Sequence, residues 1–178
     1  MPRRHGGLLD RHYWARALVR LGHEVRLIPP SYVKPFVKRG KSGWADAEAI
    51  REAVARPTMR FVAVKSPEQQ AILSLHRARD HIVRQRTQTI NMLRGPLAEF
   101  GIAVPKGVGH AIRFAQQEIG ETFAALPTEA HAVIADLCKA LLSLHSRVAW
   151  YGQQMAALAK RDPKIALLQT IPGIGPIT

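Results

Sequence analysis

The chain of 178 residues has a single cysteine, Cys138, few aromatic side chains and half as many acidic as basic residues. One cysteine excludes a disulfide framework and argues against a cysteine-rich zinc site. The sequence contains no apolar run near the roughly 18 residues that a membrane-spanning helix needs. Its first residues carry charge without the apolar segment of a secretion signal. These absences predict a cytoplasmic protein.

The scarcity of acids leaves a large positive charge. The chain has 26 Lys and Arg residues against 13 Asp and Glu residues, a formal net charge of +13. Residues 1–65 alone hold 14 basic and 5 acidic side chains. The stretch between Glu24 and Asp46 contains no acid but contains five cations, Arg26, Lys34, Lys38, Arg39 and Lys41. This local excess favours a surface that contacts nucleic-acid phosphates, although a merely solvated basic face is the alternative.

The first 65 residues alternate between helical and extended patterns. Apolar spacing predicts helices over residues 8–21, ended by Gly22, and over residues 44–56. Alternating side chains predict a strand at 23–28, ended by Pro29 and Pro30, and a second strand at 60–65. A strand, a helix and a strand in this order predict a parallel pair with a helical crossover, and hence an α/β unit. Two strands are too few for a sheet that stands alone.

Beyond residue 65 the pattern becomes helical. The sequence Ser66-Pro67-Glu68-Gln69 is typical of a capping box with proline in the first turn of a helix. Between Pro127 and Pro163, apolar residues recur at the heptad spacing of a coiled coil. This predicted seam consists of Ala130, Ile134, Leu137, Leu141, Leu144, Val148, Tyr151, Met155 and Leu158. We expect two long helices forming an antiparallel coiled-coil arm over residues 66–163, with a looser segment at 101–127 that contains a short helix near 110–120. A coiled coil between two chains is the competing arrangement.

Several residues are candidates for chemistry or binding. Asp46 and Glu48 lie in the first turn of the helix at 44–56, where carboxylates either bind Mg²⁺ or stabilise the helix dipole; the dipole role is the commoner one. Two arginine pairs repeat every seven residues and would form stripes able to follow a phosphate backbone, or the solvated sides of a coiled coil. These pairs are Arg77 with Arg84 and Arg79 with Arg86.

The end of the chain carries an apolar Pro-Gly-Ile-Gly turn that includes Gly173 and Gly175. Such a turn presents backbone N–H groups that can bind phosphate, and it resembles the hairpin of a helix-hairpin-helix DNA-binding motif. Tyr32 and Phe36 alternate with lysines and are candidates for stacking on bases. Cys138 has no evident activating neighbour except Lys139 and is expected to be an inert packed thiol.

Five motifs carry a resemblance to a known family. They are GHEVRLIPP at 22–30, YVKPFVK at 32–38, ADAEAI at 45–50, RFVAVK at 60–65 and RQRTQ at 84–88. In combination they resemble the DEDD-type insertion-sequence transposases of the insertion sequence one-hundred-ten family, which are RNA-guided recombinases. The resemblance runs over nearly the whole chain. It implies a RuvC-like, RNase H-type domain, then a coiled-coil arm, then a C-terminal domain with a nucleophilic serine.

The resemblance also implies four acids that hold Mg²⁺, and this chain matches few of them. Asp46 corresponds to one acid, while Gly43 stands at the position of its partner. The family's glutamate falls near Gly6, where no acid stands, and Asp10 is out of register. The first acid and the serine domain have no counterpart here, so the sequence predicts a catalytically inactive fragment, truncated at both ends. One carboxylate cannot organise a two-metal site.

These observations predict three regions: a partial RuvC-like α/β domain at 1–65, the coiled-coil arm at 66–163 and the start of the C-terminal transposase domain at 164–178. The expected function is that of a transposase remnant in the bacterial nucleoid that retains binding to DNA, and to guide RNA as a further partner. The alternative is a coiled-coil module that dimerises or interferes with an intact transposase. Residual Mg²⁺-dependent nuclease activity through Asp46 is a third hypothesis.

Overall fold

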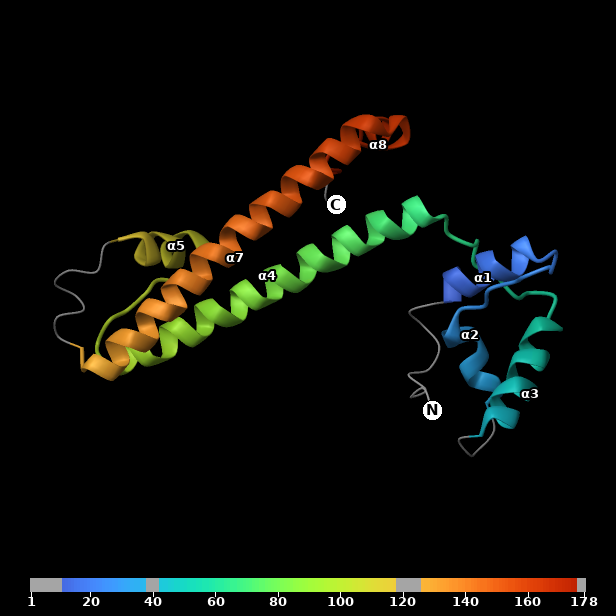
Figure 1. The fold of residues 1–178 in the computed structure, drawn as a ribbon, viewed down its shortest axis with the longest axis horizontal. Helices are drawn as coiled ribbons and strands as arrows, with labels where there is room; N and C mark the ends of the chain where they lie inside the picture. The colour runs from blue at the N-terminus through green and yellow to red at the C-terminus, as the bar shows by residue number, and fades with distance from the viewer. Residues whose placement is uncertain (1–10, 38–41, 118–125, 176–178) are drawn as a thin grey trace. The chain divides into compact units, whose positions relative to one another are not determined.

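The computed structural model describes residues 11–37, 42–117 and 126–175 (Figure 1). The chain divides into an N-terminal unit, Met1–Gln70, and a C-terminal unit, Ala71–Thr178, and each is described by itself. The N-terminal unit contains α1 (Arg11–Arg20), α2 (Pro30–Val33), the 3-10 helix η1 (Lys34–Phe36) and α3 (Gly43–Val54). The C-terminal unit contains most of α4 (Pro67–Glu99), followed by α5 (Val108–Gln116), α7 (Thr128–Arg161) and α8 (Pro163–Leu168).

The α/β prediction is wrong, because the described residues contain no strand. The two extended segments meet in a single isolated bridge between Leu27 and Val62, and that bridge is antiparallel rather than parallel. Its hydrogen bond runs from the Val62 N–H to the Leu27 carbonyl at 2.7 Å. Directly after Ile28, Pro29 and Pro30 lack the N–H groups that would continue a ladder. The described chain is therefore mostly helical, without an RNase H-like sheet.

Side chains of α1 bind the second extended segment where a neighbouring strand was expected. The backbone N–H of Lys65 donates to Nδ1 of His12 at 3.2 Å, and the Lys65 carbonyl accepts from Arg16 at 2.7 Å. His12 and Arg16 are four residues apart and so lie on one face of α1. We call these two hydrogen bonds, which join the side chains of His12 and Arg16 to the backbone of Lys65, the backbone clamp. The clamp takes the place of ladder hydrogen bonds at Lys65, and it joins residues about fifty positions apart in the sequence.

Local capping signals in the sequence are confirmed. Gly22 has a φ of +87° directly after α1, a conformation that only glycine adopts without strain. The Gln69 N–H donates to the Ser66 hydroxyl at 3.2 Å, and the Ser66 N–H donates to the Gln69 side chain at 3.0 Å. These reciprocal bonds are the predicted capping box at the start of α4. At α3, the Ala45 N–H donates to the side chain of Ser42.

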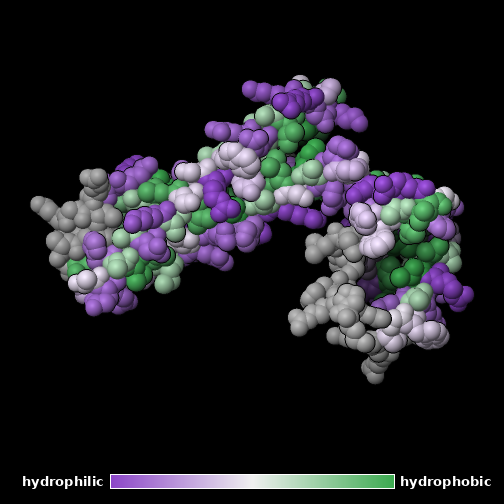
Figure 2. Space-filling view, in the orientation of Figure 1, coloured by the Kyte–Doolittle hydropathy of each residue, from purple (hydrophilic) through white to green (hydrophobic). Residues whose placement is uncertain are grey.

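The N-terminal unit buries little apolar volume. Among its described residues, the buried hydrophobic ones are four alanines, one on α1 and three at successive turns of α3: Ala15, Ala45, Ala49 and Ala53. The large apolar side chains of this unit lie partly at its surface, as the hydrophobic area on it in Figure 2 shows. Trp44, for example, is 76% exposed. Alanine contacts bring helices close together but remove only a small apolar area from water.

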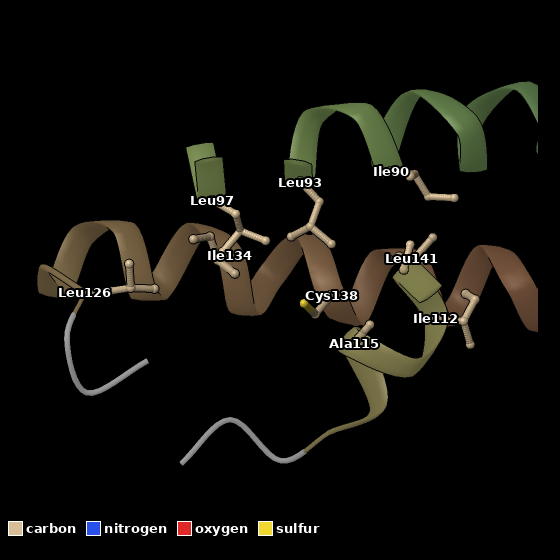
Figure 3. Packing of buried hydrophobic residues seen from close by; sticks show 10 residues of the cluster. Ile90, Leu93, Leu97, Ile112, Ala115, Leu126, Ile134, Cys138 and Leu141 are labelled. Carbon is tan, nitrogen blue, oxygen red and sulfur yellow. The ribbon is translucent and has the colours of Figure 1, made fainter. Parts of the chain in front are cut away.

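The C-terminal unit has a true apolar cluster. Helices α4 and α7 run antiparallel, and α5 packs on α7 (Figure 1). Residues of all three helices and the segment before α7 meet in the cluster of Figure 3: Ile90, Leu93, Leu97, Ala111, Ile112, Ala115, Leu126, Ile134, Cys138 and Leu141. The cluster is shared among three helices, so the described residues do not show the two-stranded coiled-coil seam that the heptad spacing predicts.

The buried face of α7 differs from the predicted seam by one position at two places. Cys138 and Ala159 are buried, whereas the predicted seam residues Leu137 and Leu158 are only partly buried. A straight helix of 3.6 residues per turn drifts away from a strict seven-residue repeat, and α5 adds a further surface to cover. No helix in the described ranges has the length and apolar character that crossing a membrane requires.

Candidate nucleic-acid interface

A groove of about 720 Å³ lies in the N-terminal unit, and we call it the α2–α3 groove. It is formed by the segment before α2, by α2 and η1, and by one face of α3. Its apolar wall consists of Leu27, Ile28, Pro30, Val33, Val37, Ile50 and Val54, and its polar residues are Arg26, Ser31, Lys34 and Asp46. The groove thus combines an apolar floor with two cations and one carboxylate.

Three residues singled out from the sequence meet in this groove: Arg26, Lys34 and Asp46. The first two were predicted to bind nucleic acid, and Asp46 was the remaining acid of the family. All three are exposed. Because α2 and η1 fold the chain between residues 30 and 36 into helical turns, Lys34 lies on the same groove as residues of α3.

Arg26 already has partners within the unit. Its guanidinium forms an ion pair with Glu24 at 2.6 Å and lies over the ring of Phe61, 5.3 Å from its centroid. Such a stack holds the planar guanidinium in a defined orientation. A phosphate would have to compete with an exposed carboxylate for Arg26, which makes Lys34 the cation of the groove that is more readily available.

A similar arrangement involves Arg56, which sequence reasoning missed. Its guanidinium lies 5.3 Å from the centroid of Phe36 and forms an ion pair with Glu52 one turn earlier on α3. Phe36 is half-buried under this arginine, so it packs within the unit. Of the two aromatic residues predicted to stack on bases, Tyr32 is the more exposed, at 44%. Phe36 and Arg56 are twenty positions apart in the sequence, and no local pattern links them. The sequence therefore offers little indication of this contact.

The described residues do not fit the Mg²⁺ site that the family implies. They contain no group of three His, Cys, Asp or Glu side chains able to hold a metal ion. Asp46 lies in the first turn of α3, and Gly43 is the first residue of that helix. An exposed carboxylate at this place stabilises the positive end of the helix dipole. Gly6 and Asp10 lie outside the described residues.

The predicted arginine stripes on α4 divide into an exposed and a half-buried pair. Arg77 and Arg84 are exposed, whereas Arg79 and Arg86 are half-buried. A guanidinium nitrogen of Arg86 lies 3.4 Å from Nδ1 of His145 on α7. The second pair therefore faces the interior of the C-terminal unit, and only Arg77 and Arg84 are presented to a ligand in solution.

The remaining predicted binding residues are placed as follows. Gly173 has a φ of +89° and is exposed, and the Ile174 N–H donates to the Ile171 carbonyl at 3.1 Å, so residues 171–174 form a turn. Gly175 follows it and is half-buried. Both glycines belong to the C-terminal unit. Lys38, Arg39 and Lys41 lie outside the described residues.

Cys138 is 3% exposed within the apolar cluster, and burial raises the pKa of its thiol above the ordinary value. A raised pKa keeps the thiol protonated at neutral pH, and the protonated form is a poor nucleophile. At the start of α4, the hydrogen bond from Ser66 lowers the pKa of the fully exposed Glu68. Neither shift produces a reactive group.

Together these features describe a mostly helical, basic protein whose N-terminal unit has a groove with two cations, one carboxylate and an apolar floor. Residues 8–102 match the family model of the IS110-type DEDD transposases, described as "Transposase". The chain belongs to this family.

Several curated relatives are similar to the chain over most of its length. A probable family 20 transposase of Pseudomonas aeruginosa is 45% identical over 94% of this chain and 50% of its own length. The transposase for insertion sequence element IS1328 of Yersinia enterocolitica is 38% identical over 94% of this chain and 49% of its own length. The chain thus spans about half the length of the curated relatives it matches. No solved structure matches the chain significantly.

Proposed function

We propose that this chain is the nucleic-acid-binding half of a transposase and that it contacts DNA through the α2–α3 groove and the exposed arginines of α4. The observation that carries the proposal is the meeting of Arg26 and Lys34 in one groove of a chain with a net charge of +13. Cations concentrated at a groove attract phosphates and release counterions on binding. The names of the curated relatives support the same class of substrate.

We expect the chain by itself not to cleave DNA. Two-metal phosphoryl transfer requires several carboxylates from different elements, and the described residues contain no such cluster around Asp46. Mg²⁺-dependent cleavage that is abolished in the Asp46→Ala variant would contradict this expectation. A chain that only binds DNA would be located with the DNA of the nucleoid. A guide RNA is a further partner to test.

The experiment measures fluorescence anisotropy of labelled DNA duplex and of structured RNA at a series of salt concentrations. The Lys34→Gln variant should weaken DNA binding about threefold to tenfold and reduce the magnitude of the salt slope by about 1. Lys160→Gln is the matched control, because Lys160 is an exposed lysine at the far end of α7. Binding that is absent, or that does not change with salt, would refute the proposal.

Association with a second copy or with an intact transposase is a second candidate function. It is favoured by exposed apolar side chains on α8 and the turn after it, Leu167, Leu168 and Ile171, of which Leu167 is 71% exposed. Contiguous exposed apolar residues mark interaction surfaces. Sedimentation equilibrium should detect oligomers of the wild type that the Leu167→Gln variant weakens. A chain that stays monomeric at high concentration would exclude this candidate.

A further inference from the structure

A second groove, of about 490 Å³, lies between α4 and α7, and we call it the α4–α7 groove. Most of its lining residues are polar: Gln85, Gln88 and Thr89 come from α4, and Ser143 and Arg147 come from α7. The residues of each helix are spaced by three or four positions, so they lie on one face of that helix. None of them was identified from the sequence as a binding residue.

The groove lies beside the contact of the two helices. Next to Gln85, the side chain of Arg86 reaches His145, and one turn further Ile90 enters the apolar cluster. This contact fixes α4 and α7 relative to each other at the level of the groove. The two polar faces are therefore held side by side by packing rather than brought together by a ligand.

The polar groups of the groove can donate hydrogen bonds to a ligand. The Thr89 hydroxyl is engaged, because it donates to the Gln85 carbonyl at 3.0 Å. Gln85 and Gln88 carry amide N–H groups, Ser143 a hydroxyl, and Arg147 a guanidinium with five donors. Arg147 is exposed. An anion can therefore reach its guanidinium from solution, and the resulting ion pair stays in contact with water.

The charge around the groove is positive. No acid lines it. Arg84 is exposed one turn before Gln88, and Lys139 is exposed one turn before Ser143. The nearest acids in the sequence of the two helices are Asp80, one turn before Arg84, and Asp136, one turn before Ala140, and both lie beyond the lining residues. Three cations thus flank or line a surface that carries no acid of its own.

We propose that the α4–α7 groove binds the phosphodiester backbone of duplex DNA, with Arg147 as its principal phosphate contact. This inference rests on the proposed function and extends it from the exposed arginines of α4 to a groove of the C-terminal unit that Arg84 flanks. The Arg147 guanidinium only donates hydrogen bonds, so it matches phosphate oxygens, which only accept them. None of the described residues that line the groove is aromatic, so stacking on unpaired bases is not its mode of binding. The contact is independent of base sequence.

The test compares the variants Arg147→Gln and Arg113→Gln, using anisotropy of a labelled DNA duplex over a salt series. Arg113 is an exposed arginine on α5 of the same unit, so its replacement removes the same charge away from the groove. Arg147→Gln should raise Kd about threefold to tenfold and lower the magnitude of the salt slope by about 1, whereas Arg113→Gln should do neither. Arg147→Lys should restore the salt slope. Circular dichroism checks that each variant is folded.

The outcomes separate this inference from the proposed function. If Lys34→Gln weakens DNA binding while Arg147→Gln matches Arg113→Gln, the α4–α7 groove is not a binding surface, and the proposed function stands. If the wild type does not bind DNA, both fail. If Arg147→Gln weakens binding to an RNA duplex of the same sequence but leaves binding to the DNA duplex unchanged, the assignment to DNA is also overturned. An equal loss on two DNA duplexes of unrelated sequence is the expected result.

Discussion

The two units of the chain differ in the interactions that stabilise each of them internally. Among the described residues of the N-terminal unit, the buried hydrophobic ones are alanines and the buried polar one is His12, which accepts a hydrogen bond from the backbone of Lys65. In the C-terminal unit, the side chains of Leu93, Leu97, Ile134 and Leu141 are fully buried in one cluster. The first unit therefore depends on directional hydrogen bonds, and the second depends on removal of apolar area from water.

This difference bears on function. A large buried side chain contributes about 1.5–3 kcal/mol through burial, whereas a hydrogen bond contributes on the order of 1 kcal/mol net. The N-terminal unit leaves Tyr13, Trp14 and Trp44 at its surface, each more than half exposed. It is therefore expected to be the less stable unit and the one that adapts to a bound partner, while the C-terminal unit serves as a rigid support.

The largest expected effect is in the apolar cluster. Leu93→Ala should lower the free energy of unfolding of the C-terminal unit by about 2–5 kcal/mol, because it removes buried methyl groups and leaves a cavity. The matched control is Met92→Ala, since Met92 is the next residue on α4 but is 55% exposed. Urea denaturation followed by circular dichroism measures both. Equal losses in the two variants would contradict the contrast in burial.

The next effect concerns the backbone clamp of the N-terminal unit. His12→Ala removes the acceptor of the Lys65 N–H and should cost on the order of 1 kcal/mol, because this hydrogen bond is only partly buried. Hydrogen exchange of residues 62–66 should speed up, while exchange in α7 stays unchanged. His23→Ala is the control, because His23 is exposed. Faster exchange throughout α7 would mean that the two units do not unfold separately.

A smaller effect depends on pH and tests the burial of Cys138. Burial raises the pKa of this thiol above its ordinary value of 9.0, so the protonated thiol stabilises the folded state. This contribution is complete below pH 9 and is lost as the pH rises through the folded-state pKa. Between pH 8 and 10.5, the wild type should therefore lose stability more steeply than Cys138→Ala. Urea denaturation at a series of pH values measures the free energy of unfolding of both proteins. If this free energy falls equally with pH in the two proteins, the thiol is accessible to water.

Sequence reasoning succeeded where the deciding contacts are local. Gly22 ends α1, and Ser66 and Gln69 cap α4 as predicted, because each of these features is determined within about one turn. It failed for the extended segments, because their pairing depends on contacts such as that of His12 with Lys65, fifty-three positions apart. The same limit applied to Arg86, whose partner His145 lies fifty-nine residues away.

The candidate site was likewise predictable residue by residue but not as an arrangement. Charge spacing identified Arg26, Lys34 and Asp46 separately. Their meeting requires the turns of α2 and η1 at residues 30–36, a region that two consecutive prolines indicated only as the end of a strand. Proline is in fact suited to the first turn of a helix, because its missing N–H has no partner there. The α4–α7 groove depends on the register of two helices, which no local pattern specifies.

The smallest expected effect is at the surface of the N-terminal unit. Glu52→Ala removes the ion pair with Arg56 one turn along α3, and both side chains are about half exposed, at 49% and 52%. Water and salt screen such pairs, so the loss should be about 0.2–0.5 kcal/mol in low salt and should vanish in 1 M NaCl. Thermal unfolding at the two salt concentrations measures it. A salt-resistant loss above about 1 kcal/mol would mean that Glu52 acts by holding Arg56 over Phe36. Surface stacking would then join the clamp at His12 in stabilising a unit whose buried residues are mostly alanines.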